Sequence, residues 1–307
     1  MRCSACSAPA VVDQPYRGRH ACADHLAASV EDRFRREMRR QLPRFRNGTV
    51  AVAISGGKDS AVALWLTHQY FAGRIPVRLL AVSVDEGIPA YRTATLRAAA
   101  ELARSLGVEH RIVRAEEELG TTTDRTAREL PGTPPCSFCG VWRRGLLNAA
   151  ARSAEADALV LGFNLDDLAQ TVLMNVARGD VDRLVRMAPH RGRQPGLVPR
   201  IAPLAQVPER EVFLYARLRG LPFDHAECPH AGRAARNRFR AVVWQLEEDH
   251  PGTRQALLRT HERLAELLGG DAGVAPSRCR ICGELASGPL CRGCEFQKLT
   301  IVTPEAP

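Results

Sequence analysis

The chain has 307 residues, and at roughly 150 residues per domain this length predicts about two structural units. Hydrophobic residues make up 45% of the chain and charged residues 25%, a balance that excludes a disordered, collagenous or coiled-coil protein. The 43 basic residues outnumber the 34 acidic ones, so the formal net charge is +9 and a polyanionic partner such as a nucleic acid is expected. No run reaches the roughly 18 apolar residues that cross a bilayer, and the first residues form no apolar signal stretch. We therefore expect a cytoplasmic protein with no membrane partner.

The ten cysteines are grouped along the chain, which in a cytoplasmic protein indicates metal binding or catalysis instead of disulfides. Two groups have the paired spacing of tetrahedral zinc sites: Cys3, Cys6, Cys22 and His25 in the first, and Cys279, Cys282, Cys291 and Cys294 in the second. Four such ligands close the coordination shell, so both zinc ions are expected to be structural and to fold miniature domains. Reduced surface cysteines that share this spacing by chance are the alternative.

Between these two groups the chain alternates between short apolar runs and helical patterns. Strands are predicted at 49–54, 77–84, 108–113 and 158–162, and helices at 59–71, 93–106, 139–152 and 165–177. This alternation predicts an α/β fold with a doubly wound parallel sheet that binds ligands at the carboxyl ends of its strands. Residues 121–135 and 188–207 are expected to be loops. Further helices are predicted at 209–218, 236–248 and 254–268.

A polar hexapeptide follows the first predicted strand and opens a helix: Ser55, Gly56, Gly57, Lys58, Asp59 and Ser60. The two glycines expose backbone amides, and together with the positive end of the helix these amides predict a phosphate-binding site. The spacing differs from the P-loop pattern GxxxxGK[ST]. Lys58 stands out because Lys298 is the other lysine in this arginine-rich chain. A simple glycine-rich turn is the alternative.

Three cysteines are left over: Cys136 and Cys139 in the sequence PPCSFCG, and Cys228 in HAECPH. A closed zinc site needs a fourth ligand, which His225 or His230 could supply. Three thiolates with one vacancy also suit a [4Fe-4S] cluster that keeps one iron free of protein ligands. The spacing alone does not decide between these two metal centres.

Asp166 and Asp167 follow the strand predicted at 158–162, at the edge where a nucleotide is expected. The structural alternative is a helix start, with Asn164 as the N-cap and the aspartates in the first turn. For the pair of aspartates we favour a functional role, either in metal binding or in orienting the substrate.

The hexapeptide resembles the PP-loop of the adenine-nucleotide α-hydrolase-like (HUP-like) enzymes, which cleave ATP between its α and β phosphates. Further motifs extend this resemblance from Cys3 to Cys294: the CxxC…CxxH set, PCSFCG, GFNLDD, HAECP and the final CxxC…CxxC set. In this order they resemble the tRNA 2-thiouridine synthetases. The closest subgroup is expected to be the bacterial enzymes that thiolate uridine-54 in the T loop, with the wobble-uridine and cytidine-32 thiolases as cousins.

The resemblance implies an ATP-dependent tRNA sulfurtransferase, which adenylates the C2 oxygen of a uridine and then replaces AMP with sulfur. ATP and Mg²⁺ are expected at residues 55–60 and at Gly162. Lys58 is expected to take the charge of the pyrophosphate, Asp59 to assist the metal, and the hydroxyls of Ser55 and Ser60 to donate hydrogen bonds.

The resemblance also implies that Cys136, Cys139 and Cys228 hold a [4Fe-4S] cluster whose free iron binds sulfide. The alternative is a cluster-free route in which Cys139 and Cys228 carry a persulfide and resolve it as a disulfide. The expected partners are tRNA and a ubiquitin-like thiocarboxylated sulfur carrier, or another sulfide donor. A homodimer also fits the resemblance.

Related enzymes usually assign catalysis to the second aspartate of the GFNLDD-type motif, which implies Asp167 as the catalytic carboxylate and Asp166 as the next candidate. The chain departs from the family pattern at three positions: Phe163 replaces a histidine, Leu168 an acidic residue, and Arg143 a lysine. Arg143 is expected to be a catalytic residue together with Lys58 and Asp59. It keeps the positive charge but does not donate a proton at ordinary pH. A diverged, non-catalytic zinc-ribbon RNA-binding protein and an amide-forming PP-loop ligase are the alternative functions.

RNA contacts are expected at three arginine-rich stretches, 33–46, 178–200 and 233–240, with an ordinary solvated helix face as the alternative for each. Five segments are expected in all. They are an N-terminal zinc finger at 1–30, a basic helical linker at 31–48, a PP-loop catalytic domain at 49–207, a helical region at 208–272 that contributes Cys228, and a C-terminal zinc ribbon at 273–307.

Overall fold

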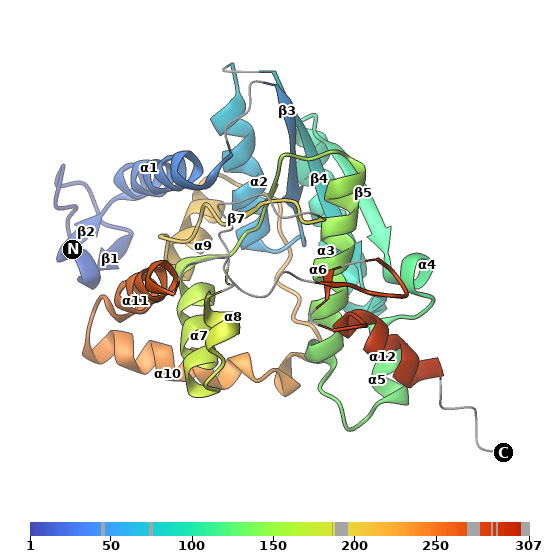
Figure 1. The fold of residues 1–307 in the computed structure, drawn as a ribbon. Helices are drawn as coiled ribbons and strands as arrows, with labels where there is room; N and C mark the ends of the chain where they lie inside the picture. The colour runs from blue at the N-terminus through green and yellow to red at the C-terminus, as the bar shows by residue number, and fades with distance from the viewer. Residues whose placement is uncertain are drawn as a thin grey trace.

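The computed structural model describes residues 1–43, 47–73, 76–185, 187, 196–268, 277–283, 285–286 and 288–301. At its centre lies a parallel sheet of five strands in the order β5-β4-β3-β6-β7 (Figure 1). These strands are β3 (Gly48–Ala53), β4 (Val77–Asp85), β5 (Glu109–Arg114), β6 (Ala158–Val160) and β7 (Arg200–Ile201). None of the helices in the described part of the chain has both the length and the hydrophobicity needed to cross a membrane.

Alternate residues of the sheet pack against helices on its two faces, which confirms the expected doubly wound fold. On β3, Val50 and Val52 belong to one apolar cluster, whereas Ala51 between them belongs to the other. The first face is covered by α1 (Ala23–Gln41), α2 (Lys58–Phe71), α3 (Pro89–Ser105) and α9 (Glu209–Leu218), and the second by α4 (Ala115–Leu119) and α6 (Pro135–Ser153).

A crevice for a ligand is expected where the order of the strands changes direction. From β3 the chain continues to β4 and β5 on one side, and it later returns to β6, which pairs with the other side of β3. The connections that follow β3 and β6 therefore diverge at the carboxyl edge of the sheet. The PP-loop follows β3, and the GFNLDD segment leads from β6 into α7 (Leu165–Ala177).

Helices from the later part of the chain pack beside this edge. In Figure 1, α7, α10 (Arg236–Asp249) and α11 (Thr253–Leu267) form a group below α1 and α9. Both α10 and α11 contact α7, and the short α8 (Val181–Val185) contacts α7 and α11. This group brings charged side chains of α10 and α11 close to the start of α7.

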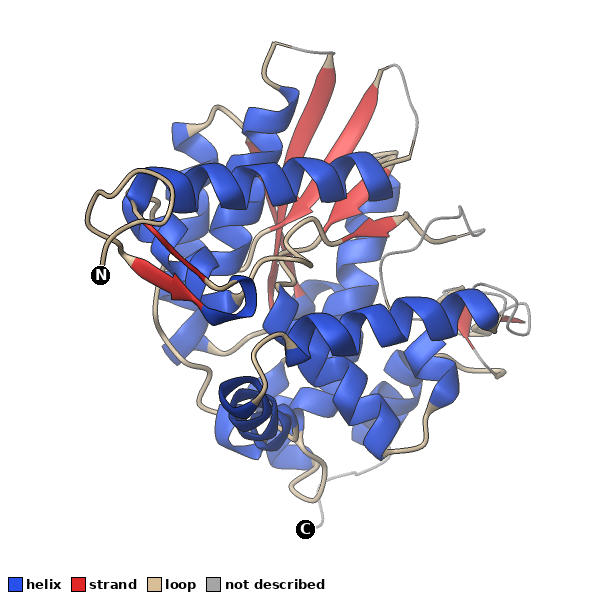
Figure 2. Ribbon diagram, turned by 90° about the vertical axis from the view of Figure 1, so that its left-hand side faces the viewer, coloured by secondary structure: helices blue, strands red, loops and turns tan. Residues whose placement is uncertain are grey.

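Small modules at the two ends of the chain lie on opposite sides of the sheet (Figure 1). In the first, β1 (Val12–Gln14), the 3-10 helix η1 (Pro15–Arg17) and β2 (Arg19–Ala21) form a hairpin at the start of α1 (Figure 2). The second contains β8 (Ser277–Arg278), β9 (Leu285–Ala286) and α12 (Arg292–Ile301), which packs on α6. Helix α1 continues through residue 30, where a boundary between segments is expected.

Two segments that we expected to be loops contain regular structure. Residues 121–135 include α5 (Thr123–Glu129), which begins where the Thr122 hydroxyl accepts a hydrogen bond from Arg125 N (3.1 Å). Threonine is a favourable N-cap, and this signal was missed. In the second segment, residues 188–195 lie outside the described residues, but Arg200–Ile201 forms β7. A strand of two residues is too short to show a period, and it is defined by its pairing with β6.

Candidate active site

The PP-loop is held in shape by hydrogen bonds among its own residues. The Ser60 hydroxyl accepts a hydrogen bond from Ser55 N (3.1 Å) and donates one to Gly57 O (2.9 Å). Gly56 has a φ of +87°, and a Cβ atom at this position would lie 1.8 Å from the carbonyl oxygen of Thr95, so the position requires glycine. Because α2 begins immediately after Gly57, the loop adjoins the positive end of a helix, as phosphate binding requires.

The Lys58 ammonium lies between two carboxylates, 2.9 Å from Asp59 Oδ2 and 2.8 Å from Glu209 Oε1. Burial opposes its charge, but the Asp59 and Glu209 carboxylates outweigh burial and raise the pKa of Lys58. Glu209 belongs to the first turn of α9 and is not among the site residues that the sequence predicts. No motif marks Glu209, and its position after Pro208 at a helix start was the available signal.

Side chains join the two loops that diverge at the carboxyl edge. Asn164 Nδ2 donates a hydrogen bond to Asp59 Oδ1 (3.0 Å). Gly162 allows the backbones to approach closely, because a Cβ atom there would lie 3.0 Å from backbone atoms of both Asp59 and Ser60. Burial raises the pKa of Asp59, although Lys58 and Asn164 act in the opposite direction. Asp59 thus connects the PP-loop to the start of α7.

The two neighbouring aspartates have different surroundings. Asp166 is 1% exposed, and its oxygens accept hydrogen bonds from Arg254 Nη1 (2.6 Å) and Glu209 N (2.7 Å), so it anchors α11 and α9 to α7. Asp167 closes a capping box with Asn164: Asp167 N donates to Asn164 Oδ1 (3.0 Å), and Asn164 N donates to Asp167 Oδ2 (3.3 Å). The helix-start alternative is therefore confirmed for Asn164 and Asp167.

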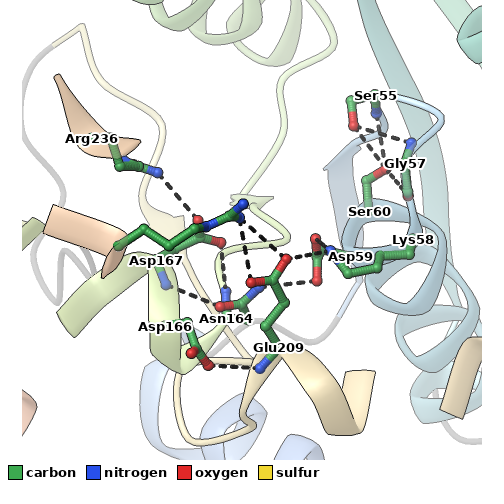
Figure 3. A network of polar contacts seen from close by, with 11 residues as sticks. Ser55, Gly57, Lys58, Asp59, Ser60, Asn164, Asp166, Asp167, Glu209 and Arg236 are labelled. Atoms are coloured by element: carbon green, nitrogen blue, oxygen red, sulfur yellow. Dashed lines mark hydrogen bonds and ion pairs between the residues drawn. The ribbon is translucent and has the colours of Figure 1, made fainter. Parts of the chain in front are cut away.

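Two arginines of α10 complete the polar network. Arg236 Nη1 lies 3.2 Å from Asp167 Oδ1, and Arg240 Nη2 lies 3.4 Å from each oxygen of Glu209. Figure 3 shows Lys58 on one side of Glu209, with Asp167 and Arg236 on the other. Burial and the nearby Asp59 carboxylate raise the pKa of Asp167 to about 6. Both arginines fall in a stretch expected to bind RNA, but they pair with carboxylates of the site.

The three central cysteines approach one another where the 3-10 helix η2 (Ala231–Arg233) packs on α6. Cys136 and Cys139 lie in the first turns of α6, and Cys228 precedes η2. Burial raises the pKa of Cys139 and of Cys228, and the Cys136 thiol acts in the same direction on both. We call these three residues the cysteine trio.

The cysteine trio is less compact than a site for a single ion. Among the described residues, the groups whose ligand atoms all lie within 4.8 Å of one another are the two terminal sets. Each histidine that could be a fourth zinc ligand has another partner. His230 Nε2 is 2.7 Å from Asp124 Oδ1, and the His225 ring packs on Phe223 with centroids 4.8 Å apart. A cluster of several irons accommodates thiolates that are farther apart, so the trio fits it better than it fits one zinc ion.

Arg143 lies one turn beyond Cys139 on α6, next to the cysteine trio. Its Nη1 atom is 3.4 Å from Oε1 of Glu86, which is 4% exposed and also pairs with Arg92. Burial opposes the charge of Arg143, but Glu86 and the neighbouring Cys139 raise its pKa. Its contacts place Arg143 in the wall around the cysteine trio.

Both terminal sets have the dimensions of tetrahedral zinc sites. In the first, Cys22 Sγ is 3.2 Å from His25 Nδ1 and 3.7 Å from Cys6 Sγ, and in the second Cys282 Sγ is 3.5 Å from Cys291 Sγ. Sulfur ligands about 2.3 Å from a tetrahedral zinc lie roughly 3.8 Å apart. Backbone hydrogen bonds, the strongest from Ala5, lower the pKa of Cys3 to about 6, which favours the thiolate that zinc binds. The donor atoms and their spacing therefore fit zinc.

The arginine-rich stretches have different environments. Residues 44–46, 186 and 188–195 lie outside the described residues, which removes part of the first stretch and much of the second. In the first stretch Arg33 is 3% exposed and forms an ion pair with Glu211 of α9. In the third, Arg236 and Arg240 pair with carboxylates, while Arg238 is exposed to solvent. A high arginine content is therefore a poor guide to an RNA surface in this chain.

Comparisons with known proteins identify the family. A family model described as a PP-loop domain matches residues 30–247. The tRNA 2-thiolation protein NcsA of Haloferax volcanii is 39% identical, over 96% of this chain and 98% of that protein. The chain belongs to the PP-loop family of tRNA 2-thiolation proteins.

Further relatives refine this assignment to the family. Cytoplasmic tRNA 2-thiolation protein 1 of Bos taurus is 36% identical, over 95% of this chain and 86% of that protein. The solved U34-tRNA thiolase NcsA from Methanococcus maripaludis, described with its [4Fe-4S] cluster, is 34% identical with a TM-score of 0.82, covering 97% of this chain and 96% of the other. The chain is thus an enzyme of this family, as the motifs predict.

The expected uridine-54 subgroup is wrong, because the solved relative that covers nearly the whole chain is a U34-tRNA thiolase. The motifs behind this expectation are the PP-loop and groups of candidate metal ligands. They identify a chemistry and a fold, but none of them reads the tRNA position, so they could not separate the two subgroups.

Proposed function

We propose that the protein is an ATP-dependent tRNA sulfurtransferase that replaces the C2 oxygen of the wobble uridine with sulfur. One observation carries the sulfur-transfer chemistry of this proposal: a single short segment contacts the PP-loop and contributes one member of the cysteine trio. Asp224 N donates a hydrogen bond to Gly56 O of the PP-loop (2.9 Å), and Cys228 follows within the same segment. Activation by ATP and delivery of sulfur can therefore act on one bound nucleotide.

The residues of the chain account for the activation step. The PP-loop amides and the start of α2 bind phosphate oxygens, and Lys58 carries the charge of the departing pyrophosphate. Asp59 would help to hold Mg²⁺, which would offset the negative charge of the phosphates when bound. Transfer of AMP to the uridine oxygen matters because a carbonyl oxygen is a poor leaving group, whereas AMP is a good one.

Asp167 is the carboxylate that we assign to the uracil base that reacts. Its Oδ2 atom is held by the capping box, whereas its Oδ1 atom faces Arg236 at the site. Because its pKa is about 6, the Asp167 carboxylate is mostly ionised at neutral pH, and this pKa is close enough to the working pH for the carboxylate to accept a proton. Asp166, which is buried and fully engaged by Arg254 and Glu209, has a supporting role in this scheme.

The donor set of the cysteine trio suits a [4Fe-4S] cluster. Three thiolates leave one iron without a protein ligand, and the cluster would supply sulfide at that iron when bound. Arg143 partly offsets the negative charge of the thiolates, since it lies next to Cys139. The persulfide route through Cys139 and Cys228 is the rival.

The proposal includes tRNA as the substrate and a ubiquitin-like thiocarboxylated carrier, or another sulfide donor, as the sulfur source. It also includes one structural zinc in each terminal set, action in the cytoplasm, and a homodimer. The relatives support the choice of tRNA and of the cytoplasm, because they are tRNA 2-thiolation proteins and the Bos taurus protein is a cytoplasmic one. The compact terminal sets support the two zinc ions.

The test is thiolation of tRNA by protein reconstituted without oxygen, followed by mass analysis of nucleosides and of mapped fragments. We expect 2-thiouridine at the wobble position and AMP formation that depends on tRNA. The variant Lys58→Ala should lose both activities and keep both zinc ions. Lys298→Ala is the matched control, because Lys298 is exposed on α12, outside the PP-loop network.

Each rival predicts a different result. Sulfur at uridine-54 or cytidine-32 would contradict the wobble assignment, and tRNA binding without AMP would favour the non-catalytic reading. Bound cluster should give about four irons per chain, and substitution of any cysteine of the trio by alanine should remove both iron and thiolation. Full activity in iron-free protein would support the persulfide route.

A further inference from the structure

Arg240 of α10 and Lys58 of α2 meet at one carboxylate oxygen. Oε1 of Glu209 lies 2.8 Å from Lys58 Nζ and 3.4 Å from Arg240 Nη2. The two cations come from separate helices, and Lys58 directly follows the glycines of the PP-loop. An oxygen anion held between two cations beside a helix start has the surroundings that a phosphate oxygen prefers.

The net charge of the network affects how it can bind phosphate. Three cations, Lys58, Arg236 and Arg240, face three carboxylates, Asp59, Asp167 and Glu209. The network is therefore close to neutral, and the phosphates of ATP would add negative charge to it. Binding becomes more favourable if a carboxylate gives up its cations to the phosphates.

Glu209 is the carboxylate that can move with least disruption. Asp59 binds Asn164, and Asp167 closes the capping box of α7, so both help to hold the loops in place. The hydrogen bonds of the Glu209 carboxylate go to the side chains of Lys58 and Arg240. Its side chain is 21% exposed, which gives it room to turn toward solvent.

We propose that the Glu209 carboxylate competes with phosphate for Lys58 and Arg240, and that these two cations exchange it for the pyrophosphate portion of ATP, which they bind together. Arg240 then contacts the substrate directly. Its guanidinium presents several N–H groups to phosphate oxygens, which is a geometry that a second lysine would not reproduce. This inference rests on ATP use at the PP-loop, and it does not depend on which nucleoside is thiolated.

The experiment is calorimetric titration of the full-length, zinc-loaded chain with pyrophosphate, with a non-hydrolysable ATP analogue and with AMP, without tRNA. Arg240→Ala should weaken pyrophosphate and analogue binding by about ten- to a hundred-fold, the range for losing a charge-assisted hydrogen bond, and should change AMP binding little. Glu209→Gln should tighten pyrophosphate binding several-fold. Arg238→Ala, an exposed arginine on the same helix, is the matched control and should change nothing.

The two substitutions should change pyrophosphate affinity in opposite directions, which separates this proposal from a purely structural ion pair. For a structural ion pair, both substitutions would lower the melting temperature and leave ligand selectivity unchanged. Unchanged pyrophosphate affinity in Arg240→Ala would overturn the proposal. Weaker pyrophosphate binding in Glu209→Gln would also overturn it, since the carboxylate would then hold the metal or the loop. Failure of thiolation in the wild-type chain would count against the proposed function alone, because these titrations contain neither tRNA nor sulfur.

Discussion

Asp167 serves both the fold and the site, and its titration connects the two. Burial and the Asp59 carboxylate raise its pKa to about 6, compared with about 3.9 for aspartate in an unfolded chain. The folded protein therefore holds this proton more tightly than the unfolded chain does. The resulting stability is fully present below about pH 4 and is lost as the pH rises through about 6, so that the ionised carboxylate costs stability at neutral pH.

Replacement of Asp167 by asparagine should remove this cost. At pH 8 we expect Asp167→Asn to unfold with a free energy higher by on the order of 1 kcal/mol, since partial solvent screening reduces the full effect. The gain should shrink as the pH is lowered toward 5, and AMP formation should be lost. Thermal unfolding across this pH range measures the gain in stability, with Asp249→Asn, at an exposed position, as the control. An equal gain at every pH would show that the pKa of Asp167 is not raised.

Arg33 shows what single residues could and could not reveal from the sequence. It lies in an arginine-rich stretch and was assigned to RNA, but its guanidinium is buried and hydrogen-bonded to Glu211 and to Gln206 O (3.1 Å). It follows Val30 by three residues and so lies on the buried stripe of α1. The helical period of the sequence therefore indicated that Arg33 is buried. The partner Glu211, which lies in a helix far along the chain, could not have been found from local pattern.

At the scale of elements, strong periodic patterns gave reliable boundaries and weak ones did not. Helices α7 and α9 run over the residues that the sequence predicts, and β3 and β4 differ by a residue at their ends. The short α5 and β7 were missed, because α5 depends on a threonine cap and β7 on pairing with β6. The same limit applies to the site: motifs marked the PP-loop and the cysteines, whereas Glu209, Arg236 and Arg240 depend on tertiary packing.

Helix α12 is an element whose packing should affect the cysteine trio. Phe296 of α12 is 4% exposed and packs on Phe138 and Trp142 of α6, in an apolar cluster that Cys139 also contacts. The Trp142 indole additionally donates a hydrogen bond to Gly293 O (3.3 Å). The C-terminal module therefore supports the turn of α6 that carries two of the three cysteines.

Phe296→Ala should loosen this support without touching a metal ligand. Loss of a buried phenylalanine costs about 3 to 5 kcal/mol where the site cannot collapse, enough to release α12 from α6. We expect faster hydrogen exchange in α12 and in the start of α6, together with faster loss of iron under oxygen, and unchanged zinc content. Ile281→Ala, at a 56% exposed position of the same module, is the control. Iron retention equal to that of the wild type would show that α12 does not support the trio.

At the scale of the whole molecule, α9 connects the N-terminal module to the nucleotide site. Glu209 and Glu211 both lie in its first turn, yet they serve different sides of the helix. Glu209 pairs with Lys58, whereas Glu211 accepts a hydrogen bond from Tyr16 of η1 (2.5 Å) and pairs with Arg33 of α1. The N-terminal module is thus one turn of helix away from the PP-loop lysine, and the C-terminal module is packed beside the cysteine trio.

This arrangement predicts that the two proposed zinc sites affect different parts of the reaction. Loss of the N-terminal zinc through Cys22→Ser should disorder η1 and the start of α1 and so remove Tyr16 from Glu211. Binding of an ATP analogue should weaken by about five-fold or more, the scale of an ordinary coupling between sites. Loss of the C-terminal zinc through Cys291→Ser should leave ATP affinity unchanged and speed the loss of iron, because α12 then no longer braces α6. Each variant is the control for the other, and zinc and iron analysis with analogue titration supplies both readouts. Equal effects of the two substitutions on both readouts would mean that each zinc acts through global stability. The contacts of α9 and α12 would then not connect the terminal modules to the site.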